Sequence, residues 1–388
     1  MSAVLCTPAL GQTTADDWNN KGKALYNQGN YAGAIVAFDE AISLDPDYTK
    51  AWVNKGSSLL AQEKYDQAIK ALEEAIKQDP DYAVAWYNEG NALLAQKKYD
   101  KAIEAYNEAI RLGIDNAFAW NNKGKALKAQ GKYDEAIEAY NEAIRLDPNY
   151  ALSWDGKGDA PYNQGNYADA IKYYDEAIRI DPSYVDAWDS KGDALNKQGN
   201  YADATKCYDE AIRIDPSYAH PWDSKGNVLI EQGNYADTIK CYDEAIRIDP
   251  SDAKAWYNKG AAHESQGNYA SAIKCYDKAI RIDPSDAHAW DGKGNALNKQ
   301  GNCADAIKCF DEAIRIDPSY AHPRDGKGDA LYNQGNYADA IKCYDEAIRI
   351  DPSYADAWGS KGDALNQLGY GAESEAAFAK AKELGYRD

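Results

Sequence analysis

Apolar residues along the chain recur with the spacing of helices rather than of strands. In most of the sequence they stand at i, i+3, i+4 and i+7, which is typical of an amphipathic helix. Two such stretches alternate throughout, and the pattern predicts, for example, helices over 151–165 and 167–181. A Gly near the end of the first stretch and an Asp-Pro at the end of the second are helix stop signals. We therefore expect an all-α chain built from short helix pairs.

A period of 34 residues organises these helix pairs. Every Trp occupies the same position of the period, and Arg324 stands where the period calls for one more Trp. Gly follows the Trp position by four residues, and Tyr, Ala and Pro positions keep the same step. The period gives eleven repeats that begin near residues 15, 49, 83, 117, 151, 185, 219, 253, 287, 321 and 355.

This W…G…Y…A-x₃-F/Y-x₂-A…P pattern over residues 15–388 resembles the tetratricopeptide repeat (TPR) family. The resemblance implies a right-handed superhelical solenoid of about eleven helix-turn-helix repeats. We expect one continuous solenoid over 15–388, because a single helix pair cannot bury its Trp, Tyr and Phe alone. The third residue after Trp is Lys, as in Lys21, Lys55 and Lys123, where the family usually has Leu. We expect this departure to cost some apolar packing.

The Gly four residues after Trp is expected to let a neighbouring helix approach closely, which would offset its helix cost of about 1 kcal/mol. Other positions break the pattern and predict local opening. Pro161 lies inside a predicted first helix, where proline costs about 3 kcal/mol. Arg324 beside Pro323 removes a core Trp. The remaining departures are Cys303 in place of a core Tyr, His263 in place of Leu, and Gly113-Ile114 in place of Asp-Pro.

Composition and charge narrow the function. With 43 Lys and Arg against 63 Asp and Glu, the net charge is −20, which argues against nucleic acid or an anionic membrane as a general partner. Apolar residues make up 44%, which argues against disorder, and no stretch approaches the length of a membrane span. No phosphate-binding loop, dinucleotide fingerprint, EF-hand or nucleophile elbow occurs. We therefore expect no enzyme activity, no catalytic residues, no cofactor and no built metal site.

Cysteines and histidines recur with the repeat. Five cysteines are one repeat apart and should lie about 10 Å from one another, too far for a disulfide. We interpret them as copied small apolar residues, with cross-linking between molecules as the alternative. These are Cys207, Cys241, Cys275, Cys309 and Cys343. Three of the four histidines, His220, His288 and His322, also share one repeat position.

The informative feature is charge on the inner surface. In stacks that resemble TPR arrays the first helices line a concave groove, and the inward positions are two before Trp and one, five, eight and nine after it. In repeats five to eleven these positions are mostly acidic, whereas repeats one to four hold lysines such as Lys23 and Lys125. The candidate partner-binding residues are Asp155, Asp159, Asp189, Asp193, Asp223, Asp291, Asp325, Asp329 and Asp363.

Several of these residues are i,i+4 pairs of like charge, which mildly destabilise a helix and so favour a cationic ligand. A Lys/Arg-rich peptide suits the groove, and a loosely held divalent cation is an alternative. Copying of a repeat whose Asp has no role is the competing interpretation. Acidity also argues against the chaperone tails that some TPR domains bind through a Lys and Asn clamp, which no repeat here matches. A self-assembling structural protein is the alternative function, since near-identical surfaces suit head-to-tail stacking.

Both ends of the chain lie at the edge of the repeats. Residues 1–14 are apolar near their start, and Ala9-Leu10-Gly11 has the small residues of a signal-peptidase site, but no Lys or Arg precedes them. A remnant of a signal peptide and a disordered N-terminus are both open interpretations, so the compartment is undecided between cytoplasm and export. The charged segment 372–384 is expected to cap the stack.

Overall fold

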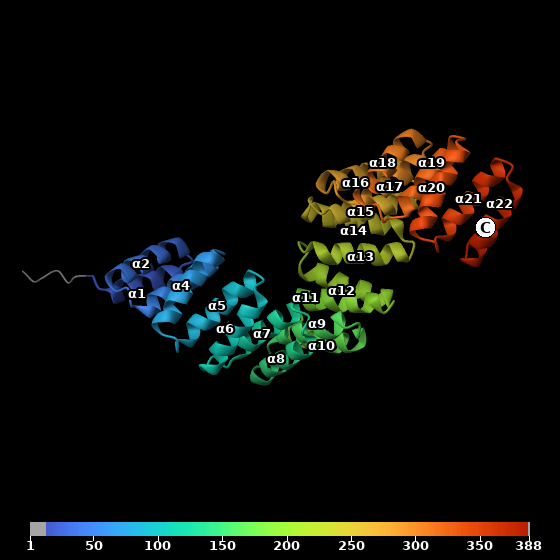
Figure 1. Cartoon of the computed structure of the whole chain (residues 1–388). Helices are drawn as coiled ribbons and strands as arrows, with labels where there is room; N and C mark the ends of the chain where they lie inside the picture. The colour runs from blue at the N-terminus through green and yellow to red at the C-terminus, as the bar shows by residue number, and fades with distance from the viewer. Residues whose placement is uncertain (1–12, 387–388) are drawn as a thin grey trace, which may run out of the picture. The chain divides into compact units, whose positions relative to one another are not determined.

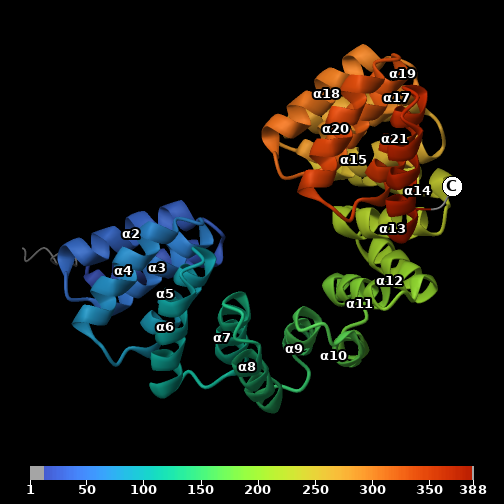
Figure 2. The same cartoon turned by 45° about the vertical axis from the view of Figure 1, so that its right-hand side comes forward.

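In a computed structural model that describes residues 13–386, the chain consists of 22 α-helices, with no strand among these residues. Within residues 15–197, and likewise within residues 201–383, consecutive helices run back and forth and pack side by side (Figures 1 and 2). The all-α solenoid expected from the sequence is confirmed. The helices form two compact units that divide between Gly199 and Asn200, which places the two helices of repeat six in different units.

The first unit contains eleven helices, which alternate as first and second helices of the repeats. They are α1 (Ala15–Asn27), α2 (Tyr31–Leu44), α3 (Thr49–Ala61), α4 (Tyr65–Gln78), α5 (Ala83–Ala95), α6 (Tyr99–Arg111), α7 (Ala117–Ala129), α8 (Tyr133–Leu146), α9 (Ala151–Asn163), α10 (Tyr167–Ile180) and α11 (Val185–Lys197).

The second unit contains the remaining eleven helices. They are α12 (Tyr201–Ile214), α13 (Ala219–Glu231), α14 (Tyr235–Ile248), α15 (Ala253–Ser265), α16 (Tyr269–Ile282), α17 (Ala287–Lys299), α18 (Cys303–Ile316), α19 (His322–Asn333), α20 (Tyr337–Ile350), α21 (Ala355–Gln367) and α22 (Gly371–Glu383).

The Gly-Asn turn that joins the helices of a repeat explains where they end and begin. Gly29 has a φ of 75°, a left-handed conformation in which glycine carries no side-chain penalty. Asn30 follows as the N-cap of α2, and its Oδ1 accepts a hydrogen bond from the Gly33 N–H at 3.0 Å. Most other repeats keep the same turn, so its residues set the helix boundaries throughout the chain.

The core of most repeats is one aromatic ring surrounded by alanines, whereas repeat two has Leu72 in its place. The ring belongs to the second helix, as in Tyr276, which is 1% exposed. A Cβ added to Gly260 of the first helix would lie only 2.8 Å from this ring. The close approach expected at this glycine is therefore present, because glycine alone leaves room for the ring.

The Trp of each repeat is half-buried rather than part of the innermost core. In most repeats its indole N–H donates to the carbonyl of the Pro that closes the preceding repeat, as from Trp52 to Pro46 at 2.9 Å and from Trp86 to Pro80 at 2.8 Å, whereas the Trp120 indole donates to Asp115 Oδ1 at 2.7 Å. Trp52 and Trp86 still pack against the buried core, so the predicted core Trp lies at the edge of the core rather than at its centre. The indole N–H connects the first helix of a repeat to the preceding turn by a hydrogen bond. An aliphatic side chain could not form this bond, because it has no donor.

The Lys three residues after Trp has a role that the sequence did not indicate. The Lys55 ammonium lies 5.2 Å from the centroid of the Trp52 ring and 2.7 Å from a carboxylate oxygen of Asp39 in the preceding repeat. The same ion pair joins neighbouring repeats at 2.5 to 2.7 Å in Lys191–Asp175, Lys225–Asp209, Lys259–Asp243, Lys293–Asp277, Lys327–Asp311 and Lys361–Asp345. The expected loss of apolar packing is thus accompanied by a cation–π contact and an ion pair.

The irregular positions are accommodated within the helices. Pro161 is buried near the end of α9 and cannot donate to the Lys157 carbonyl one turn earlier. Arg324 is 7% exposed in the place of a Trp, and its Nη1 donates to the Tyr320 carbonyl at 3.1 Å. Helix α19 begins one residue later than its counterparts.

Hydrogen exchange is expected to be faster in repeats five and ten than in repeat six. The missing backbone hydrogen bond at Pro161 and the replacement of Trp by Arg324 lower the free energy of local opening. Exchange followed by mass spectrometry on peptides from α9, α11 and α19 measures this difference. Equal protection of all three would contradict the prediction.

Three other sequence expectations concern the cysteines and the chain ends. Cys241, Cys275 and Cys309 are buried thiols, in accord with their interpretation as small apolar residues, and burial raises the pKa of the Cys241 thiol to about 11. Among the helices of residues 13–386 none is long and apolar enough to cross a membrane. The segment proposed to cap the stack forms α22. The proposed signal-peptide remnant lies outside the described residues.

Candidate functional site

All nine candidate residues lie on first helices of their repeats, as predicted. The helices α9, α11 and α19 carry two each, and α13, α17 and α21 carry one each. Their burial differs widely. Four are almost fully buried, with exposed fractions of 9% for Asp155, 5% for Asp189, 4% for Asp291 and 7% for Asp325. Asp159, Asp193, Asp223 and Asp329 are half-buried, and Asp363 is exposed.

The aspartates directly after the Trp position contact a tyrosine of the next repeat. The Tyr184 hydroxyl donates to Asp155 Oδ2 at 3.2 Å, and the Tyr354 hydroxyl donates to Asp325 Oδ2 at 3.2 Å. In each case the other carboxylate oxygen, Oδ1, is buried without a hydrogen-bond partner. A buried polar atom in this state carries a free-energy cost, so the protein only partly satisfies the hydrogen-bonding capacity of these two carboxyls.

The aspartates five residues after the Trp position contact the core tyrosine of their own repeat. The Tyr174 hydroxyl donates to Asp159 Oδ1 at 2.9 Å, and the Tyr344 hydroxyl donates to Asp329 Oδ1 at the same distance. In repeat seven an Asn accepts the corresponding hydrogen bond, since the Tyr242 hydroxyl donates to Asn227 Oδ1 at 2.9 Å. A neutral amide can thus replace the carboxylate at this position without loss of the hydrogen bond.

Burial and neighbouring charge disfavour ionisation of several of these carboxyls. Burial raises the pKa of Asp155 to about 7, and the adjacent Asp159 raises it further against the effect of the Tyr184 hydrogen bond. Burial likewise raises the pKa of Asp325 to about 7, with added repulsion from Asp329. These carboxyls consequently titrate near neutral pH.

In each unit a basic side chain lies next to one of the candidate aspartates. The Lys128 ammonium forms an ion pair with Asp159 Oδ2 in the first unit. In the second unit His322 Nδ1 lies 2.7 Å from Asp291 Oδ2, and this contact raises the pKa of the imidazole above its usual range. The His322 ring also stacks on Tyr320, with centroids 5.9 Å apart.

The other candidates stand apart from these clusters. Asp223 on α13 accepts from the Asn227 amide at 3.1 Å, and its pKa is raised by burial and by the nearby Asp252. Asp189 and Asp193 share one helix, α11. The structure therefore brings together Asp155 with Asp159, Asp325 with Asp329, and Asp189 with Asp193, whose carboxylates lie within 4.8 Å of each other, while Asp363 is exposed.

Sequence reasoning missed the tyrosines that hold these aspartates. Each Tyr184-type residue comes 29 positions after its aspartate, four residues before the next Trp position. The signal was present in the sequence as a second Tyr series. Sequence reasoning also missed Glu89, which is the third residue after Trp86, a position that is Lys in the other repeats. Burial and the nearby Glu73 raise the pKa of the Glu89 carboxyl to about 7.

Comparison with sequence families identifies the repeats. A model described as "Tetratricopeptide repeat" matches residues 53–117, 156–219, 224–287 and 266–321, and a second with the same description matches 15–48 and 117–150. A model described as "TPR repeat" matches 328–369. No curated protein matches the chain in sequence.

The chain is similar to several solved structures. The Cut9-Hcn1 hetero-tetramer of the APC/C aligns with 98% of this chain and 95% of its own, at 11% identity and a TM-score of 0.51. YrrB, described as a TPR protein with an unusual peptide-binding site, aligns with 49% of this chain and 97% of its own, at 23% identity and a TM-score of 0.41. Yeast Tom70 aligns with 96% of this chain and 92% of its own, at 16% identity and a TM-score of 0.42. At these identities the likeness concerns the fold alone.

Proposed function

Because the chain belongs to the tetratricopeptide repeat family, we propose that it is a non-enzymatic scaffold that binds a basic, extended peptide along its acidic first helices. Repeats of this family form protein-interaction folds and are generally not enzymes. The finer assignment rests on the first helices of repeats five to eleven. A Lys/Arg-rich segment of a partner protein is the ligand that their carboxylates favour.

The observation that carries this proposal is the partly satisfied negative charge at Asp155 and Asp325. Each has a buried Oδ1 without a hydrogen-bond partner and lies one helical turn from a second carboxylate. A guanidinium or ammonium group bound at such a helix would relieve the repulsion between the two carboxylates. It would therefore favour their ionised form, which burial and the neighbouring carboxylate disfavour in the free protein. Charge-assisted hydrogen bonds of this kind are about twice as strong as neutral ones.

Hydrogen bonding to tyrosine is the competing reason for these aspartates, and the two roles can be separated. Asn keeps an acceptor for the tyrosine hydroxyl but removes the charge, as Asn227 does in repeat seven. A chain in which Asp189, Asp193, Asp325 and Asp329 are all changed to Asn should therefore fold. If the carboxylates bind the ligand, it should bind a Lys/Arg-rich peptide about 10-fold more weakly or worse, which corresponds to about 1.4 kcal/mol.

The binding is measured by fluorescence anisotropy of a labelled peptide of alternating Arg and Gly at low and moderate salt. Asp169→Asn combined with Asp203→Asn, Asp237→Asn and Asp339→Asn is the matched control, because it removes the same charge from second helices. Unchanged affinity after the four first-helix substitutions, or an equal loss in the control, would contradict the proposal.

A further inference from the structure

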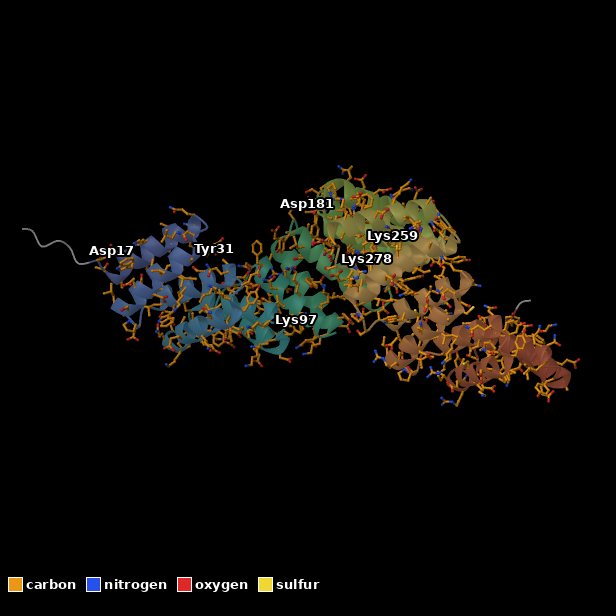
Figure 3. All side chains as sticks on the ribbon, turned by 90° about the horizontal axis from the view of Figure 1, so that it is seen from above. Asp17, Tyr31, Lys97, Asp181, Lys259 and Lys278 are labelled. Atoms are coloured by element: carbon orange, nitrogen blue, oxygen red, sulfur yellow. The ribbon has the colours of Figure 1, made fainter. Side chains whose placement is uncertain are left out.

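Several lysines lie close together at one place on the surface of this acidic protein. A surface hollow of about 760 Å³ lies at the turns of repeats three and four and is lined by Lys97, Lys98, Lys101 and Lys132. Lys97, labelled in Figure 3, stands in the turn before α6. These lysines lie on turns and second helices, away from the first-helix aspartates described above. The hollow is therefore separate from the candidate groove.

The lysines replace residues that the local backbone favours. Lys97 has a φ of 59° at a position where most repeats have Gly, and a side chain in this conformation costs about 1 kcal/mol. Lys98 and Lys132 stand at N-caps where most repeats have Asn, and neither forms a side-chain cap hydrogen bond. Losing such a cap also costs about 1 kcal/mol. At these three positions most repeats have a Gly or Asn that stabilises the turn or the helix end, whereas repeats three and four have Lys.

The sign of the charge is also reversed at the edge of the hollow. Lys101 occupies the repeat position that holds Asp in five later repeats: Asp169, Asp203, Asp237, Asp305 and Asp339. Several of those aspartates pair with a lysine three residues later, as in Asp169–Lys172 at 2.7 Å. Lys101 thus adds positive charge to the lining of the hollow at a position that is acidic in those repeats.

Most of these lysines form no ion pair with residues in the described part of the chain. Among the described residues no carboxylate forms an ion pair with Lys97, Lys98 or Lys132. Asp100 is the one acidic residue that lines the hollow, and its Oδ1 accepts a hydrogen bond from the Gln130 amide at 2.6 Å. Only Lys101 lies close enough to a buried acid, Glu89, to affect its pKa.

We propose that this basic hollow is a second binding site, which takes a short Asp/Glu-rich segment of a partner protein. Charge complementarity favours an anionic ligand. A long polyanion is disfavoured. It would extend past the two turns that carry the lysines and along a protein whose net charge is −20. A second copy of the chain brings the same charge of −20 and is repelled at long range. A segment with a few carboxylates fits the footprint.

The test exchanges the lysines for the residues of the other repeats. Lys97→Gly with Lys98→Asn restores the glycine turn and the N-cap, so the variant should be at least as stable as the parent in urea. Its affinity for a labelled peptide with six consecutive Glu residues should fall about 10-fold at 50 mM salt. Adding Lys132→Asn should weaken binding further. The parent's own affinity should fall steeply at 300 mM salt, because screening shortens the reach of exposed charges.

The control removes two other exposed lysines, Lys206→Asn with Lys240→Asn, which changes the net charge equally. It should leave affinity for the Glu peptide unchanged. The proposal would be overturned if the parent did not bind the Glu peptide, if the Lys97→Gly, Lys98→Asn variant bound it with equal affinity, or if the control lost as much affinity. Tighter binding of an oligo-dT strand than of the Glu peptide would also overturn it. So would sedimentation that shows the parent as a dimer and the Lys97→Gly, Lys98→Asn variant as a monomer. Because both substitutions favour stability, loss of binding cannot arise from unfolding.

Discussion

Replacing Gly260 with Ala should destabilise the second unit by about 2 kcal/mol. The new Cβ would lie 2.8 Å from Tyr276 Cε1, a separation that real side chains do not show. The ring cannot move away, because Gly292 of the next repeat lies against its other side, where an added Cβ would also come within 2.8 Å. Overpacking of this kind costs about 1 to 3 kcal/mol or more, and the gain of Ala in helix propensity recovers only about 1 kcal/mol.

Urea unfolding followed by circular dichroism measures the loss, and hydrogen exchange in α15 and α16 locates it. Gly371→Ala is the matched control, since Gly371 lies in α22 and a Cβ added there meets no atom within 4 Å. We expect that control to be neutral or slightly stabilising. A Gly260→Ala protein as stable as Gly371→Ala would show that the ring is not confined between the two glycines.

The architecture could be predicted because it depends on residues close together in the sequence. Helices α9 and α10 follow from the apolar period and from the Gly-Asn and Asp-Pro signals at their ends. The close approach at the Gly four residues after Trp followed from its recurrence alone. Such features recur in most of the eleven repeats, so each is seen against several copies of its own environment.

The roles of individual polar side chains could not be predicted in the same way. The indole of Trp52 has its partner in a backbone carbonyl, and the partner of Lys55 lies in the preceding repeat. The carboxylates of Asp155 and Asp325 were predicted on the correct helices, but their tyrosine partners are 29 residues away. A periodic sequence shows that such positions recur, whereas which of them meet depends on how neighbouring repeats stack.

Raising the pH from 5 to 8 should destabilise the protein through Asp155 and Asp325. Their carboxyls have a pKa of about 7 in the folded chain, whereas an unfolded aspartate has a pKa near 3.8. Between these values the folded state binds more protons than the unfolded state, so its stability is full below about pH 4 and falls as the pH rises through 7. Over the interval from pH 5 to 8 each group should contribute a loss of about 3 kcal/mol.

The double variant Asp155→Asn, Asp325→Asn should lose much of this pH dependence and be more stable than the parent at pH 8. Asn can accept the hydrogen bonds from Tyr184 and Tyr354 and carries no charge to bury. Asp169→Asn with Asp339→Asn is the control, because ion pairing holds the pKa of both exposed carboxyls below the usual range. Those groups are ionised in both states above pH 5, so the control should keep the parent's slope.

Urea unfolding at intervals from pH 5 to 8 gives the slopes to be compared. Identical slopes for the parent and for the Asp155→Asn, Asp325→Asn variant would mean that these carboxyls are already ionised in the folded chain at pH 5. The same titration bears on the groove, since a site that becomes fully charged only above neutral pH should hold a basic peptide more tightly at pH 8 than at pH 6. Stability and affinity would then change in opposite directions with pH, because ionisation of the same buried carboxyls destabilises the folded chain and strengthens its attraction for cations.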